Sequence, residues 1–182
     1  MPASLSAIPG LSRGHWRDTS PTLPSGHDAL DAQLPGGGWP LGAVSEILSD
    51  GRPGEGLGLL LPSLAHLTQA GRWVALLDPP WRPYAPALAH AGLDLRHVIV
   101  VRSPAPRTAL WTCEQLLRDL AGGAVLAWPL ESPGFGPLRR LQLAAAGGRQ
   151  AGFLFRPAGA ARSPSPAALR LQLEAREGRL RA

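Results

Sequence analysis

Short apolar runs alternate with amphipathic segments along most of the chain. The runs predicted to form strands cover residues 43–48, 72–78, 97–101, 124–128 and 152–155. The segments between them that are predicted to form helices cover residues 59–70, 84–91, 107–120 and 136–146. Buried strands separated by amphipathic helices are typical of a parallel sheet covered on both faces. The pattern therefore predicts an α/β fold with three layers, αβα. Its buried sheet residues should include Val98, Val100, Val125, Leu126 and Phe153.

The last segment follows a different pattern, with a period of two. Leu169, Leu171 and Leu173 alternate with polar residues, and Gly178 then precedes a second short run. This alternation predicts a C-terminal antiparallel hairpin added to the edge of the sheet. An exposed strand edge suits strand addition by a partner segment. The three leucines are therefore candidate partner-binding residues.

The chain reads as one domain preceded by an arm. Residues 1–23 are rich in Ser, Pro and Gly and are predicted to be a flexible N-terminal arm, whereas residues 24–182 form the core domain. With 182 residues, of which 45% are hydrophobic, the chain is long enough for one ordinary core. The N-terminus lacks a signal-peptide pattern, and no apolar run reaches the roughly 18–20 residues of a membrane span. We therefore expect a cytoplasmic protein that does not act at a membrane.

Cysteine and histidine offer little chemistry. The single cysteine, Cys113, excludes an intrachain disulfide and is expected to be a core residue on a helix. The histidines are far apart in sequence and lack metal-ligand spacing, so we expect no metal site. They are His15, His27, His66, His90 and His97.

The formal charge of +5 comes from arginine alone, because the chain contains no lysine. The arginines are scattered and form no basic stripe of the kind that follows a nucleic-acid backbone. Arg139 and Arg140 are an adjacent pair at the start of a predicted helix, so they are candidates for contact with an acidic surface or with DNA.

A glycine-rich loop stands where a phosphate-binding loop would be expected. It lies between a predicted strand and a predicted helix and includes Gly51, Gly54, Glu55 and Gly56. A working loop needs Gly-x4-Gly-Lys-Ser/Thr, because the lysine reaches the terminal phosphates and the hydroxyl binds magnesium. Neither residue is present here, and Glu55 adds a negative charge where anions would bind. The loop is thus a degenerate P-loop, or an ordinary glycine turn between strand and helix.

Three segments resemble the ImuA family of the RecA/SulA-like group. They are residues 34–48 (LPGGGWPLGAVSEIL), residues 83–95 (PYAPALAHAGLDL) and residues 152–157 (GFLFRP). The likeness extends over residues 24–175 and implies a RecA-like core. ImuA proteins are non-catalytic accessory proteins of the SOS-induced translesion synthesis complex. The implied partners are ImuB, RecA and the error-prone replicative-type polymerase, with weak DNA contact.

Compared with RecA, the resemblance also implies that the nucleotide site has been lost. Pro80 stands where the family has its catalytic glutamate, and Trp128 stands where it has an aspartate linked to magnesium. Arg156 and Pro157 replace the nucleotide-sensing glutamine. Together with the missing lysine, these changes remove four parts of a phosphoryl-transfer site. We therefore expect no catalytic residues, no nucleotide cofactor and no enzymatic activity.

Three functions remain open from the sequence. The first is the ImuA-type accessory role. The second is that of a SulA-like cell-division inhibitor that binds FtsZ, because SulA shares the sheet, the strand with the Gly-Phe-x-x-Arg-Pro pattern and the absent P-loop. The third is an atypical nucleotide hydrolase, which the absence of lysine disfavours.

Overall fold

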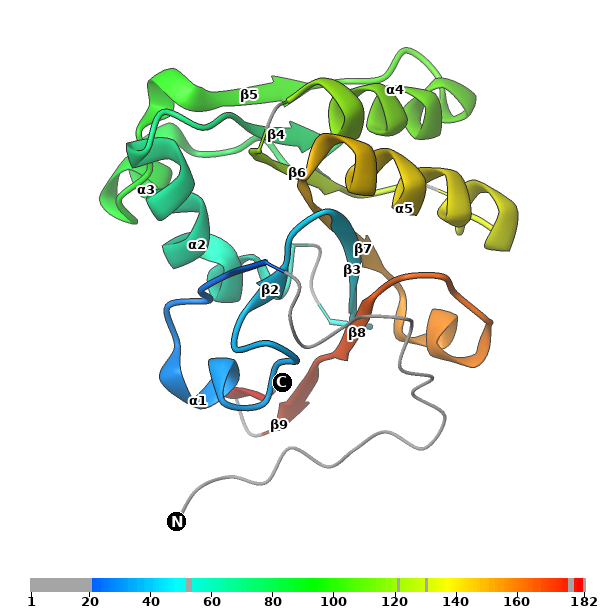
Figure 1. Ribbon diagram of the computed structural model, residues 1–182, viewed down its shortest axis with the longest axis horizontal. Coiled ribbons are helices and arrows are strands. Elements are labelled where there is room, and N and C mark those ends of the chain that lie inside the picture. Colours follow the sequence, from blue (N-terminus) through cyan, green and yellow to red (C-terminus); the bar gives the residue numbers. More distant parts are fainter. Residues whose placement is uncertain (1–20, 52–53, 121, 130, 177–178, 182) are drawn as a thin grey trace.

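A six-stranded parallel sheet forms the centre of the protein in the computed structural model, which describes residues 21–51, 54–120, 122–129, 131–176 and 179–181. The strand order is β5-β4-β6-β7-β3-β8 (Figure 1). The strands are β3 (Ala43–Leu48), β4 (Val74–Leu77), β5 (Val98–Val101), β6 (Ala124–Ala127), β7 (Ala151–Arg156) and β8 (Leu169–Gln172). The five core strands predicted from the apolar runs are all present.

Helices cover both faces of this sheet and bury two separate apolar clusters. Helices α2 (Leu57–Gln69) and α3 (Ala85–His90) pack on one face, and α4 (Pro106–Asp119) and α5 (Phe135–Gly148) pack on the other (Figure 1). Successive side chains of a strand point to opposite faces, so Leu126 belongs to the first cluster and Val125 to the second. The predicted α/β architecture with three layers is confirmed.

The N-terminal part of the described chain is built into the core. Strand β1 (Thr22–Leu23) pairs with β2 (Trp39–Pro40), and the short helix α1 (Asp28–Asp31) lies between them. Trp39 is fully buried, and its ring meets that of Phe153 edge-on at 5.4 Å. The core therefore includes Leu23, which is buried. The predicted flexible arm covers residues 1–23, of which residues 1–20 lie outside the described part of the chain.

The predicted hairpin beginning at Leu169 is wrong in its pairing. Strand β8 runs parallel to β3, with Ser45 opposite Leu169, and so forms the outermost strand of the main sheet. The antiparallel hairpin lies farther along the chain, where β9 (Glu174–Arg176) pairs with β10 (Arg179–Arg181) in a sheet of their own. An edge strand with one covered face shows the same alternation as a hairpin strand, so the pattern alone did not distinguish the two.

The predicted burial of the sheet residues holds in the centre and fails at one edge. Val125, Leu126 and Phe153 are buried, as predicted. Val98 is only half-buried, and Val100 is 47% exposed, because β5 is an outer strand with a neighbour on one side only among the described strands. A run of apolar residues predicts a strand without showing whether it lies at the centre or the edge of the sheet.

Candidate protein-binding site

The glycine-rich loop that follows β3 is occupied by one of its own side chains. The carboxylate of Glu55 accepts a hydrogen bond from the hydroxyl of Ser49 and lies directly against Gly51. The same hydroxyl oxygen accepts a hydrogen bond of 3.0 Å from the backbone N–H of Gly51. The described part of the loop therefore holds a negative charge of its own beside the glycine backbone, which disfavours a phosphate there.

Close packing explains the two glycines at the end of this loop. Gly54 and Gly56 have φ values of 85° and 90°, in the region that favours glycine. A Cβ at Gly54 would lie 2.6 Å from the ring of Trp81, and one at Gly56 would lie 2.6 Å from Leu173. The loop is therefore packed against an aromatic ring and a leucine. These glycines have a structural role that needs no bound nucleotide.

Aromatic rings fill the carboxyl edge of the sheet where the resemblance placed lost acidic residues. Trp128 is buried and stacks on Phe155, with ring centroids 4.4 Å apart and planes 10° from parallel. The ring of Trp81 meets Trp128 edge-on at 5.0 Å. Pro80 is exposed beside this cluster. Neither position therefore offers a carboxylate for magnesium.

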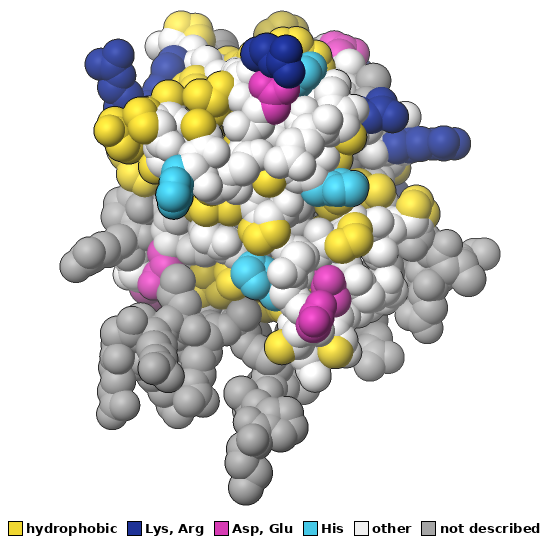
Figure 2. All heavy atoms as spheres, turned by 90° about the vertical axis from the view of Figure 1, so that its left-hand side faces the viewer, with side chains coloured by type: hydrophobic (Ala, Val, Ile, Leu, Met, Phe, Trp, Pro, Cys, Tyr) yellow, Lys and Arg dark blue, Asp and Glu magenta, His cyan; other side chains and the backbone are white. Residues whose placement is uncertain are grey.

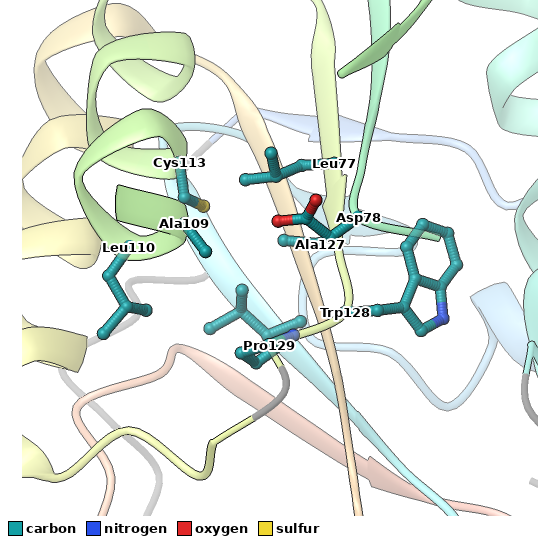
Figure 3. A pocket seen from close by; sticks show the side chains of 9 residues that line it. Leu77, Asp78, Ala109, Leu110, Cys113, Ala127, Trp128 and Pro129 are labelled. Carbon is teal, nitrogen blue, oxygen red and sulfur yellow. The ribbon is translucent and has the colours of Figure 1, made fainter. Parts of the chain in front are cut away.

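A small apolar pocket lies between α4 and the carboxyl ends of β4 and β6. Figure 3 shows the Cys113 thiol and the Asp78 carboxylate on facing sides of this pocket, with the Trp128 ring turned away. Asp78 already accepts a hydrogen bond of 2.7 Å from the backbone N–H of Ser103. Burial, with a smaller contribution from Glu114, raises the pKa of Cys113 to about 12. The thiol therefore stays protonated and is a poor nucleophile, which agrees with the predicted core role.

A buried ionic network joins three adjacent strands, and sequence reasoning missed it. Glu46 of β3 is fully buried and pairs with Arg156 of β7 and, at 2.6 Å, with Arg170 of β8. Its carboxylate also accepts a hydrogen bond of 2.9 Å from the hydroxyl of Ser165. The available signal was a carboxylate inside an apolar strand, which requires a buried cation as partner.

The two arginines of this network also hold the neighbouring chain segments. Arg156 donates to the hydroxyl of Ser132 at 2.7 Å and to the carbonyl of Pro133 at 3.1 Å. Arg170 donates to backbone carbonyls of the 3-10 helix η2 (Ala158–Arg162), among them that of Ala161 at 3.2 Å. Arg156, which the resemblance treated only as a replaced glutamine, therefore has a structural role of its own.

The structure separates the predicted partner-binding residues into two groups. Leu169 and Leu173 are buried and Leu171 is half-buried, so these side chains belong to the core. Arg139 and Arg140 lie exposed on α5. Of the five predicted residues, only Arg139 and Arg140 are exposed, and their binding of a partner stays a prediction.

The outer edge of β5 carries an unusual share of exposed apolar surface. Trp73 is 42% exposed and lies edge-on to His97 at 5.4 Å, while Leu95 and Val100 are also exposed. The carbonyl of Val101 accepts from the Asp78 N–H at 2.9 Å and so faces β4. Because backbone groups alternate in direction along a strand, those of Val98 and Val100 face the open side. We call the set Trp73, Leu95, His97, Val98 and Val100 the β5-edge surface.

Beside the β5-edge surface lies a hollow lined by Gly71, Arg72, Trp73, Asp119 and Leu120. Figure 2 faces the side of the molecule where α3 lies and shows hydrophobic side chains gathered at its upper left, next to arginine side chains. Exposed apolar groups beside charged ones are typical of surfaces that bind other proteins.

Two further observations concern other kinds of site. Among the described residues, no group of three or more His, Cys, Asp or Glu side chains is placed to hold a metal ion, and His15 lies outside them. None of the described helices has the length and apolar character needed to cross a bilayer.

Comparisons with known proteins name one family. The model of the family described as "Cell division inhibitor SulA" matches residues 42–152. The cell division inhibitor SulA of Cronobacter sakazakii is 33% identical over 120 residues, which are 64% of this chain and 70% of the relative. The SulA of Klebsiella aerogenes is 31% identical over 117 residues, or 64% of this chain and 69% of the relative.

A solved structure agrees with these relatives. The crystal structure of SulA from Pseudomonas aeruginosa matches with a TM-score of 0.51 and 29% identity, covering 62% of this chain and 97% of that one. An inhibitor of cell division is not an enzyme, so the prediction of no enzymatic activity is confirmed at the level of the family. The resemblance to the RecA/SulA-like group is confirmed for SulA, and ImuA remains a proposal. The chain belongs to the SulA family.

Proposed function

We propose that the protein is a non-enzymatic inhibitor of cell division, produced in the SOS response, that acts in the cytoplasm by binding FtsZ. The observation that carries this proposal is the family match over residues 42–152, which spans the chain from β3 to the start of β7. The sequence favoured the ImuA role and kept this one as the alternative, and the comparisons support the alternative better.

The degenerate loop supports a role in binding rather than in hydrolysis. Glu55 lies where a phosphate would need positive charge, and Trp81 and Leu173 pack against the loop glycines. A fold of this kind without its nucleotide site retains helix faces and sheet edges as its main means of action. Protein contact is therefore the activity that the described residues favour.

The β5-edge surface is our candidate for the contact with FtsZ. It combines exposed apolar side chains with backbone N–H and C=O groups that lack a strand neighbour on the outer side within the described sheet. Such an edge can accept a strand from a partner, or be covered by one of its loops.

The direct test is sedimentation of FtsZ polymers formed with GTP in the presence of the purified protein. We expect the protein to reduce the pelleted FtsZ in proportion to its concentration. We expect Val100→Asp to abolish the effect while leaving the protein folded by circular dichroism. Phe135→Ser is the matched control, because Phe135 is also 47% exposed but lies at the start of α5. Unchanged FtsZ pelleting at several-fold excess of folded protein would refute the proposal.

A second candidate function is the ImuA-type accessory role, with ImuB as the main partner and RecA and the error-prone polymerase as further partners. The observation that favours it is the part of this chain that lies outside the match to the solved SulA structure. The match covers 62% of the chain, so 100 − 62 = 38% of the chain lies outside it. The match to the SulA family model begins at residue 42, so Trp39, in the glycine-turn segment that resembles ImuA, lies before it. In this role, Arg139 and Arg140 would make the contact with RecA or the weak contact with DNA.

Pull-down of purified FtsZ, ImuB and RecA separates the two candidates. A variant that lacks residues 174–182 tests whether the tail contributes to binding. This shorter deletion is preferred because a deletion from Leu169 onward would also remove the core strand β8. The SulA-like function requires binding of FtsZ. Binding of ImuB without FtsZ would establish the second candidate instead.

A further inference from the structure

Helix α4 presents a tryptophan to solvent on the side opposite its buried face. Ala109, Cys113 and Leu117 are buried against the sheet, at the spacing of one helix face. With 100° per residue, Trp111 lies on the opposite side, and it is 63% exposed. Arg118 follows two turns later on the same side and is also exposed. Well over half of this large aromatic residue is therefore open to solvent.

Helix α5 lies beside α4 and presents a second apolar side chain (Figure 1). Its buried face includes Leu138, Leu141 and Ala145, so Leu143 points outward and is 61% exposed. Gly136 and Gly147 flank this strip, and a Cβ at either would meet no atom within 4 Å. Small residues at both ends allow close approach by another chain.

Charged groups between and beside these apolar side chains are mainly positive. Glu114 lies between Arg118, at 2.6 Å, and Arg140, at 3.5 Å. Arg139 is exposed and has no hydrogen-bond or ion-pair partner among the residues that the structure describes. Three arginines and one glutamate leave 3 − 1 = 2 positive charges. We call this surface the α4–α5 face, consisting of Trp111, Glu114, Arg118, Arg139, Arg140 and Leu143.

We propose that the α4–α5 face binds an acidic amphipathic segment of a partner protein, whose apolar side chains cover Trp111 and Leu143 and whose carboxylates pair with the arginines. Exposed Trp and Arg side chains are the residue types most enriched among binding hot spots. The face is separate from the β5-edge surface, so the proposal goes beyond inhibition of cell division and adds a second docking surface.

Charge complementarity selects this occupant over two others. A second copy of the chain would bring arginine against arginine, because a two-fold interface pairs the same patch with itself. A nucleic acid would leave Leu143 without a role, and three arginines around an apolar centre do not form the stripe that a phosphate backbone requires. An acidic amphipathic segment satisfies both the apolar and the charged groups.

The test uses a synthetic, fluorescein-labelled helical peptide with Leu on one face and Glu on the other, measured by anisotropy against the full chain. We expect saturable binding, and a loss of about tenfold or more in affinity for Trp111→Ser and for the double variant Arg139→Glu with Arg140→Glu. Leu143→Ser serves as a second apolar variant if Trp111→Ser alters the circular dichroism spectrum. Tyr84→Ser and Arg82→Glu, an exposed aromatic and an exposed arginine elsewhere, should retain the affinity.

Several outcomes would overturn the proposal. If a peptide in which Lys replaces Glu binds equally well, the α4–α5 face makes only nonspecific apolar contacts. Stronger binding of single-stranded DNA that depends on the arginines but not on Trp111 would make it a nucleic-acid surface. A dimer in sedimentation velocity that Trp111→Ser dissociates would make a second copy the occupant. Failure of FtsZ inhibition would leave this test unaffected, because the probe contains no FtsZ.

Discussion

At the scale of single residues, the fully buried carboxylate of Glu46 has the greatest structural consequence. It forms ion pairs with Arg156 and Arg170, and so connects β3 with two strands that come more than a hundred residues later in the sequence. Such a cluster is weak evidence for net stabilisation, because removing three charged groups from water is costly. Removal of a single member of the cluster is expected to destabilise the protein, because the remaining charged groups lose their partner away from bulk water.

We expect Glu46→Ala to lower the free energy of unfolding by about 3–5 kcal/mol, because it leaves the buried guanidinium group of Arg156 and the partly buried one of Arg170 without their carboxylate partner. The matched control is Glu114→Ala, which also removes a glutamate paired with two arginines, but between exposed side chains. That change should cost less than about 1 kcal/mol. Urea denaturation followed by circular dichroism measures both, and equal losses for the two variants would contradict this assignment.

At the scale of elements, the outer strand β5 is more exposed than the central strands, and the pattern of apolar residues does not predict this difference. The apolar run of β5 resembles that of β6, yet among the described strands β6 has neighbours on both sides and β5 has a neighbour on one side only. The same valine type is therefore buried at Val125 and exposed at Val100. Position in the sheet, rather than side-chain chemistry, decides the effect of a substitution.

This difference can be measured directly with one substitution at two positions. Val125→Asp should lower the free energy of unfolding by about 3–5 kcal/mol, because a carboxylate without a partner would be buried. Val100→Asp should cost less than about 1 kcal/mol, because the new carboxylate stays in contact with water. Thermal unfolding by calorimetry gives both values. Similar midpoints for the two variants would show that the strands are misplaced.

The order of elements could be predicted from the sequence, whereas their lateral neighbours could not. Periodicity depends on local contacts, so it identified the core strands and the helices between them. The parallel pairing of Leu169 with Ser45 joins residues more than a hundred positions apart, and no local pattern encodes it. That the loop lacks phosphate chemistry stays a prediction from the sequence, whereas the packing of Trp81 on Gly54 depends on the tertiary fold and could not be predicted.

At the scale of the whole molecule, the carboxyl edge of the sheet, where the resemblance to RecA predicts a lost nucleotide site, is filled by the protein's own side chains. Side chains from β7 and from the connections after β4 and β6 meet at the carboxyl edge of the sheet, where Trp81, Trp128 and Phe155 pack together. We therefore place the candidate functional contacts on other surfaces, namely the β5-edge surface and the α4–α5 face.

We accordingly expect titration calorimetry with Mg-ATP or Mg-ADP to show no binding with a dissociation constant below about 100 μM, which corresponds to roughly −5.5 kcal/mol. The physical reason is the carboxylate of Glu55 in the loop, together with the absence of a lysine anywhere in the chain. Glu55→Gln provides an informative companion variant. Tight binding by the unchanged protein would show that the loop rearranges to admit phosphate.

The position of β3 within the sheet also has a consequence for synthesis on the ribosome. Both of its neighbours, β7 and β8, come late in the chain, and Ala43 pairs with Ala151, 151 − 43 = 108 residues away. At about 5–20 residues per second, β3 waits roughly 5–20 s for its first neighbour. During that interval an apolar strand carrying the charge of Glu46 lacks both arginines that neutralise it. The nascent chain therefore passes through a period in which this apolar strand has been synthesised but has neither of its sheet neighbours, and its unpaired edges are exposed to aggregation during that time.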